Sequence, residues 1–102
     1  MLPPRALNEV GRVLTHGAAK YGPHNWRGGL AYSRIIGATL RHILAYMMGE
    51  DMDPETDLPH IAHAACNLLF LIEYTLTNTG QDDRYKSPPI EINPPRQLRY
   101  SD

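Results

Sequence analysis

The sequence predicts an all-α fold with three main helices per chain and an extended C-terminal tail. Three segments carry apolar residues at helical spacing, and glycine and proline separate these segments. The last segment, residues 81–102, holds four prolines and shows no helical periodicity. We therefore expect a helical domain over residues 1–80 and a Pro-rich tail over residues 81–102.

The first helix is predicted over residues 4–19. Pro3 and Pro4 suit a first helical turn, where a missing N–H group costs nothing. Gly22-Pro23 ends the segment. Its apolar residues recur at helical spacing: Leu7, Val10, Leu14 and Ala18.

The second helix is predicted over residues 30–50. Its expected core stripe is Ile36, Leu40, Ile43, Leu44 and Met47. Arg34 and Arg41 lie two turns apart on another face, about 10 Å along the axis. This spacing suits a polyphosphate, although two solvated arginines would look the same.

The third helix is predicted over residues 58–78, and its nearly continuous apolar character indicates the central helix of the fold. The expected core face is Ile61, Ala65, Leu68, Ile72 and Leu76. His60, His63 and Asn67 form a polar stripe on the same helix. Burying the Asn67 amide requires a partner, so this residue is either a satisfied structural amide or part of a site.

The loop 20–29, KYGPHNWRGG, contains the single tryptophan of the chain. Trp26 and Arg27 can stack on a nucleobase, and Asn25 can hydrogen-bond its edge. The alternative is that Trp26 covers the hydrophobic core.

The acidic turn is the strongest candidate for a site. Five of the eleven carboxylates fall between Glu50 and Asp57, and two histidines follow. Such a cluster is either a solvated loop or a cation site, because carboxylate and imidazole are ligands of divalent ions. The simpler role for Asp53 or Asp57 is to cap the third helix.

Composition excludes several function classes. A net charge of −1 and a pI near 6.5 give no electrostatic footprint for nucleic acid. The single cysteine, Cys66, excludes an internal disulfide and a Cys-based zinc site. No secretory or membrane-spanning pattern is present, so we expect a cytoplasmic protein. Three helices this apolar leave more surface than a small monomer covers, which predicts a homo-oligomer, a dimer or tetramer.

Four motifs in this order, KYGxxNW, RHxxAY, GExxDPET and HxxHAxxN, resemble the phage-type dATP/dGTP diphosphohydrolases. This family is related to the MazG-like all-α NTP pyrophosphatases, and the resemblance covers residues 2–76. It implies a MazG-like helical bundle built by oligomerisation, acting in the host cytoplasm if phage-encoded. It also implies hydrolysis of purine (deoxy)nucleoside triphosphates to monophosphate and pyrophosphate with Mg²⁺ or Mn²⁺.

The MazG-like superfamily holds its metals with an ExxE motif and an ExxD motif. Here the one ExxD is Glu50-x-x-Asp53, and no ExxE is present. The motif residues therefore carry over from the phage-type family, whereas the metal-ligand geometry of the superfamily does not.

The resulting site hypothesis assigns Glu50 and Asp53 to catalysis and, with His63 and Asn67, to metal binding. A water molecule would attack the α-phosphorus. Nucleotide contacts are assigned to Lys20, Asn25, Trp26, Arg27, Arg34, Arg41, His42 and His60.

Two other functions remain open. The missing ExxE acids fit a regulatory module that binds nucleotide and Mg²⁺ without cleaving it. A purely structural helical oligomer would leave the acidic turn solvated.

Overall fold

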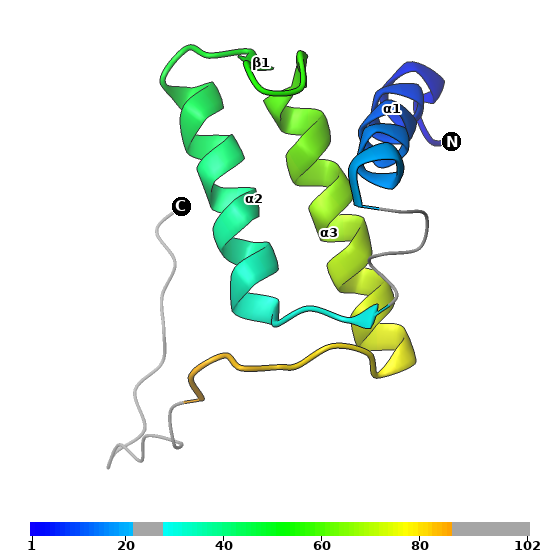
Figure 1. Ribbon diagram of the computed structural model, residues 1–102, viewed down its shortest axis with the longest axis vertical. Coiled ribbons are helices and arrows are strands. Elements are labelled where there is room, and N and C mark those ends of the chain that lie inside the picture. The colour runs from blue at the N-terminus through cyan, green and yellow to red at the C-terminus, as the bar shows by residue number, and fades with distance from the viewer. Residues whose placement is uncertain (22–27, 87–102) are drawn as a thin grey trace, which may run out of the picture.

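The computed structural model describes residues 1–21 and 28–86, with the backbone alone for residues 18–21 (Figure 1). The predicted mostly helical fold with three helices is confirmed. The element order is α1 (Pro4–Tyr21), α2 (Tyr32–Met47), β1 (Met52–Asp53), β2 (Leu58–Pro59) and α3 (His60–Thr77). The two short strands were not predicted.

Helix α2 ends three residues before the predicted boundary because Gly49 adopts a left-handed conformation, with φ +96°. The Gly49 N–H donates to the Tyr46 carbonyl at 3.0 Å, and the Glu50 N–H donates to the Ala45 carbonyl at 3.1 Å. This pair of bonds is a Schellman motif, which a glycine at this position favours. Glu50 therefore lies outside the helix, in the turn.

Strands β1 and β2 form an antiparallel pair that connects α2 to α3, with Met52 opposite Pro59 and Asp53 opposite Leu58. The Asp53 carbonyl accepts the Asp57 N–H at 2.7 Å and closes the turn. The expectation that Asp53 or Asp57 caps α3 is wrong, because Pro59 is at the N-cap position and no side chain caps the helix. Asp57 instead adopts a positive φ of 56° within the turn.

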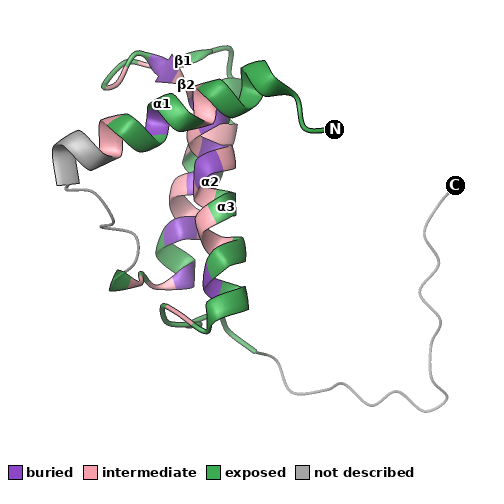
Figure 2. Cartoon of the chain, turned by 90° about the vertical axis from the view of Figure 1, so that its right-hand side faces the viewer, coloured by how far each residue is buried: buried purple, intermediate pink, exposed green. Residues whose placement is uncertain are grey.

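Helices α2 and α3 lie side by side as an antiparallel hairpin, and α1 crosses α3 on the side away from α2 (Figures 1 and 2). Two small core clusters hold this arrangement. The first joins α1 to α3 through Val13, Leu58, Ala62 and Cys66. The second joins the lower halves of α2 and α3 through Tyr32, Ile35 and Tyr74.

At the base of the hairpin, two chain segments cross at glycines. A Cβ atom on Gly29 would lie 2.8 Å from the Gly80 nitrogen, and one on Gly80 would lie 2.7 Å from the Leu30 carbonyl oxygen. Both glycines also have positive φ, 83° and 77°. Ala31 and Gln81 form a parallel bridge beside this crossing, so the base is tightly closed.

The segment after α3 caps α2. The Ser33 N–H donates to Asp83 Oδ1 at 2.9 Å, and the Ser33 hydroxyl donates to Asp83 Oδ2. These hydrogen bonds lower the pKa of Asp83. A carboxylate at this position satisfies orphan N–H groups and complements the helix dipole. The cap thus comes from a residue far away in the sequence.

The predicted core face of α3 is wrong. Four of its residues are solvent-exposed in the single chain, by 44%, 45%, 55% and 76%: Ile61, Leu68, Ile72 and Leu76. The fifth, Ala65, is half-buried. The buried positions of α3 are His60, Ala62, Ala64, Cys66 and Tyr74.

The same correction applies to part of the other two predicted stripes. Of the predicted α2 stripe, Leu40, Leu44 and Met47 are exposed, and of the predicted α1 stripe, Leu7 and Leu14 are exposed.

The buried face of α3 could not be predicted from periodicity, because apolar residues lie on nearly all sides of this helix. The polar stripe turns inward because its side chains find hydrogen-bond partners there.

Candidate functional site at the turn end of the hairpin

A chain of hydrogen bonds links Glu50, His60 and His42 where α2 ends and α3 begins. His60 Nε2 lies 2.7 Å from Glu50 Oε1, and His60 Nδ1 lies 2.8 Å from His42 Nδ1. A carboxylate accepts and does not donate, so His60 Nε2 carries the proton. In neutral His60 the Nδ1 atom then accepts from His42 Nδ1, which leaves a lone pair on His42 Nε2.

A second set of contacts surrounds Asp53. Asp53 Oδ1 accepts the Glu55 N–H at 2.8 Å, which fixes the carboxylate against its own turn. Asp53 Oδ2 lies 3.7 Å from His63 Nε2, and Thr56 Oγ1 lies 2.7 Å from the same nitrogen. The side chains of Asp53 and His63 are only 15% and 13% exposed. Asp53 is therefore well held and largely shielded from water.

The imidazoles of His42 and His63 resist protonation. Burial, followed by the neighbouring His63, lowers the pKa of His42, and burial is also the largest cause of the lowered pKa of His63. The Asp53 carboxylate opposes both shifts without reversing them. The His42 and His63 rings stack nearly parallel, at 4° with centroids 4.6 Å apart. Neutral imidazoles of this kind can act as ligands or proton acceptors.

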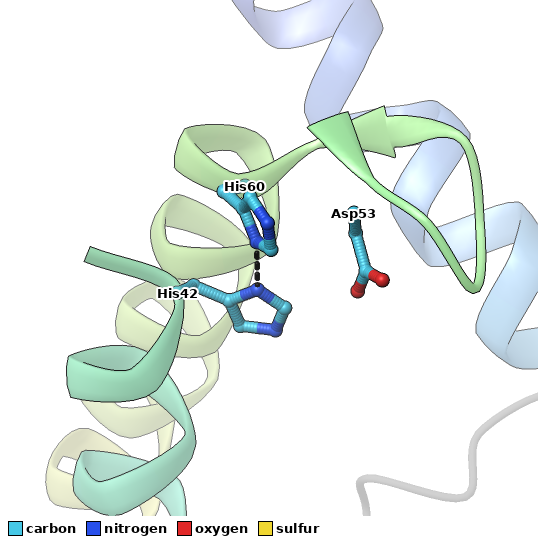
Figure 3. Close-up of side chains that lie close together, drawn as sticks. All are labelled: His42, Asp53 and His60. Carbon is cyan, nitrogen blue, oxygen red and sulfur yellow. Dashed lines mark hydrogen bonds between the residues drawn. The ribbon is translucent and has the colours of Figure 1, made fainter. Parts of the chain in front are cut away.

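One group of the described residues can hold a metal ion. Single ligand atoms of His42, Asp53 and His60 all lie within 4.8 Å of one another (Figure 3). Two imidazoles and one carboxylate suit a borderline transition ion. They do not form an all-oxygen Mg²⁺ site, since Mg²⁺ prefers oxygen ligands and normally takes some from substrate phosphates.

The structure brings part of the predicted site together. His42, His60, His63, Glu50 and Asp53 all meet at the turn end. Asp53 lies next to His63, as the predicted metal group has it, whereas Glu50 contacts His60, which was assigned to nucleotide binding.

The remaining predicted residues lie elsewhere or are not described. Asn67 is half-buried, one turn along α3 from His63, and Arg34 and Arg41 are exposed on α2. The predicted contacts of Lys20, Asn25, Trp26 and Arg27 lie outside the residues and side chains that the structure describes.

Sequence reasoning missed Thr56. Its hydroxyl contacts His63 and also accepts the Leu58 N–H at 3.3 Å, so it ties the turn to α3. The sequence signal was its position seven residues before His63, inside a turn that prolines and acids already marked. A threonine in a turn is too common to be singled out without the fold.

Comparison with known proteins decides the family. The family model described as "dATP/dGTP diphosphohydrolase, N-terminal" matches residues 1–84. The chain belongs to the dATP/dGTP diphosphohydrolase N-terminal family. The resemblance inferred from the four motifs is thereby confirmed. The match covers both the histidine cluster and Asp83, the residue that caps α2.

A relative in Salmonella phage PMBT28, named "dATP/dGTP diphosphohydrolase", is 42% identical over 90 residues. The aligned region covers 88% of this chain and 31% of the relative, so this chain spans less than a third of the relative's length. No solved structure was found to match the chain. Within the described ranges, no helix has the length and apolarity needed to cross a membrane.

Proposed function

We propose that this chain carries the nucleotide site of a metal-dependent diphosphohydrolase. The reaction converts purine (deoxy)nucleoside triphosphates, dATP and dGTP first, to monophosphate and pyrophosphate in the cytoplasmic nucleotide pool. Membership of the dATP/dGTP diphosphohydrolase N-terminal family carries the proposal. The buried or half-buried imidazoles and the fixed carboxylate at the turn end support it, because phosphoryl chemistry needs cation ligands and proton acceptors.

Arginines on α2 suit the phosphates of the substrate. Arg34 and Arg41 are both exposed and lie on one stripe of α2, and Arg41 directly precedes His42 in the sequence. Guanidinium groups bind phosphate oxygens in a bidentate manner. The loop residues Asn25 and Trp26 are proposed to hold the purine.

The proposed chemistry is in-line hydrolysis at the α-phosphorus. A bond forms between the water oxygen and the α-phosphorus, the bond to the bridging oxygen breaks, and pyrophosphate leaves. Glu50 and Asp53 are the proposed acceptors of the water proton, with His63 and Asn67 in support. A divalent ion, Mg²⁺ or Mn²⁺, would supply charge neutralisation and activation of the water.

The test is turnover of a panel of dNTPs and NTPs by the full chain with Mg²⁺ or Mn²⁺, resolving every product. We expect purine monophosphate and pyrophosphate, and Arg41→Gln should raise KM about tenfold or more because it removes a phosphate contact. Arg12→Gln on α1 is the matched control, since Arg12 pairs with Glu9 away from the site. Inorganic triphosphate as product would contradict the proposed attack position.

The missing ExxE acids favour a second candidate, a regulatory module that binds nucleotide with Mg²⁺ and does not cleave it. Saturable nucleotide binding with no pyrophosphate release in the same assay would select it.

We also propose that a second copy covers the exposed face of α3, so that a MazG-like helical bundle forms by oligomerisation. The apolar side chains Ile61, Leu68, Ile72 and Leu76 follow one another at helical spacing along that face. A two-fold axis would place this stripe against itself, as in isologous dimers.

Light scattering of the full chain tests this assembly. We expect at least a dimer mass for the wild type and a monomer mass for Ile72→Asp, because a charge in the stripe opposes burial. Leu7→Asp on α1, where the wild-type residue has a similar 44% exposure, is the matched control and should keep the dimer mass. A monomeric wild type at micromolar concentration would refute the assembly.

A further inference from the structure

We infer that His42, Asp53 and His60 form a site for one late first-row divalent ion of the Zn²⁺ and Co²⁺ class, which they bind in preference to Mg²⁺. This inference rests on the proposed function and refines it at the same site: Mg²⁺ or Mn²⁺ would accompany the substrate phosphates, whereas these three residues would hold an ion that suits nitrogen donors. The binding itself rests on the geometry of these three residues and does not require turnover.

The two imidazoles already face each other almost as two ligands of one ion do. His42 Nδ1 and His60 Nδ1 lie 2.8 Å apart, and their rings are tilted by 49° (Figure 3). Two imidazole nitrogens that share an ion at about 2.1 Å each lie roughly 3.0–3.4 Å apart. Two changes therefore convert the hydrogen-bonded pair into two ligands: a separation of a few tenths of an ångström, and a shift of the His42 proton from Nδ1 to Nε2, which frees the Nδ1 lone pair.

Glu50 prepares His60 for this role. By accepting the Nε2–H of His60, the carboxylate leaves the Nδ1 lone pair of neutral His60 directed at His42. Metal-bound histidines commonly donate their other N–H to a carboxylate in this way, which fixes the ring and raises its basicity. The His60 side chain is only 7% exposed, so water competes little for its nitrogens.

Asp53 supplies the charge that a cation needs. The Asp53 side chain is largely shielded from water. One of its carboxylate oxygens, Oδ1, accepts the Glu55 N–H within the turn. Among residues 1–17 and 28–86, the ion pairs of Asp53 include His63 and no lysine or arginine. A shielded carboxylate without a lysine or arginine partner in these ranges gains most from a bound cation.

The type of ion follows from the donors. Imidazole nitrogens favour Zn²⁺, Co²⁺ and their neighbours over Mg²⁺, and affinity rises along the series to copper. Two nitrogens and one carboxylate also leave positions for water or a phosphate oxygen, as in open zinc sites. The same site can therefore hold an ion before any nucleotide binds.

Metal titration of the full chain, stripped with a chelator, tests the inference. Visible absorption should show Co²⁺ bands that saturate at one ion per chain, and Zn²⁺ should displace Co²⁺. Calorimetry should give a Zn²⁺ affinity about 100-fold or more above that for Mg²⁺. No saturable Co²⁺ or Zn²⁺ binding, or equal affinity for Mg²⁺, would overturn the site and leave a hydrogen-bonded imidazole pair.

Variants locate the ion. Asp53→Asn and His42→Gln should each weaken Zn²⁺ binding by about 100-fold, and Glu50→Gln by roughly 10–100-fold through the orientation of His60. Asp51→Asn, an exposed acid in the same turn, is the matched control and should bind as the wild type does. Circular dichroism of each stripped variant separates lost ligands from lost fold. Wild-type affinity in Asp53→Asn and His42→Gln would overturn the assignment.

The outcome for the site is separable from the outcome for the function. Tight Zn²⁺ binding without nucleotide turnover supports the site and removes the proposed reaction. Turnover with Mg²⁺ by a chain that shows no saturable Zn²⁺ or Co²⁺ binding supports the reaction and overturns the site.

Discussion

The two ends of the α2–α3 hairpin have opposite characters. At the base, Tyr74 is fully buried, its ring lies 6.4 Å from that of Tyr32, and Asp83 caps α2. At the turn end, the space between the same two helices is occupied by histidines and a carboxylate, with Glu50 half-exposed beside them. The base is packed and closed, and the turn end is polar and partly open.

This difference shows where the chain concentrates stability and where it concentrates chemistry. Packing an aromatic core gains free energy from burial. Grouping imidazoles and carboxylates costs desolvation unless each polar atom is satisfied. Among the described residues, the buried side-chain nitrogen and oxygen atoms all have hydrogen-bond partners. Changes at the base should therefore affect stability, and changes at the turn end should affect activity.

The largest expected effect is at the base. Tyr74→Ala should lower the free energy of unfolding by about 3–5 kcal/mol, because it leaves a cavity where a fully buried ring stood. Urea denaturation measures the loss. Tyr74→Phe is the control, since it keeps the ring and removes the hydroxyl, and it should cost much less. Equal losses for the two variants would show that the hydroxyl, not the ring, holds the base together.

The next effect is at the turn end and should appear in activity alone. Asp53→Asn keeps an oxygen that can accept the Glu55 N–H, so the turn should persist and the melting temperature should change little. The loss of charge should lower kcat about 100-fold or more if Asp53 serves the proposed reaction. Steady-state kinetics and thermal melting of the same preparation check both statements. A large fall in melting temperature would contradict the contrast between the ends.

The smallest effect concerns the cap of α2. Asp83→Ala removes both hydrogen bonds to Ser33 and should lower the melting temperature by a few degrees, without the loss of activity expected for Asp53→Asn. Asp51→Ala, a change of an exposed acid at the other end, is the control.

The effect of the cap should also depend on pH. Because the folded pKa of Asp83 lies below its ordinary value of 3.8, the cap contributes fully above that value. Its contribution is lost as pH falls through the lower folded pKa. Thermal melts at successive pH values should therefore show a constant difference between wild type and Asp83→Ala down to about pH 4, and a shrinking one below. A difference that persists unchanged in strong acid would mean that the carboxylate charge is not responsible.

The sequence predicted the helices well because apolar periodicity and proline or glycine breaks are local signals. The third helix was predicted over 58–78 and observed as His60–Thr77. Its buried face could not be predicted, since Leu68 and Ile72 on one side look as apolar as Ala64 and Leu71 on another. Which apolar side is covered depends on where the other helices pack.

The sequence predicted many of the residues of the candidate site, but it did not predict which of them contact one another. The acidic turn and the stripe of His60 and His63 were visible in the sequence. The pairing of His60 with His42 depends on how α2 and α3 align, and the contact of Thr56 with His63 depends on the β turn. Such pairings are non-local or turn-dependent, so a single sequence does not specify them.

The crossing at the base has one more consequence, for the modular use of this structure. Ala31 and Gln81 pair side by side, so the two ends of the segment between them lie next to each other. A segment with adjacent ends can be transplanted into a loop of a host protein without stretching either chain. The helical hairpin that bears the histidine cluster thus has the end-to-end geometry of a domain that can be inserted into a loop of another protein.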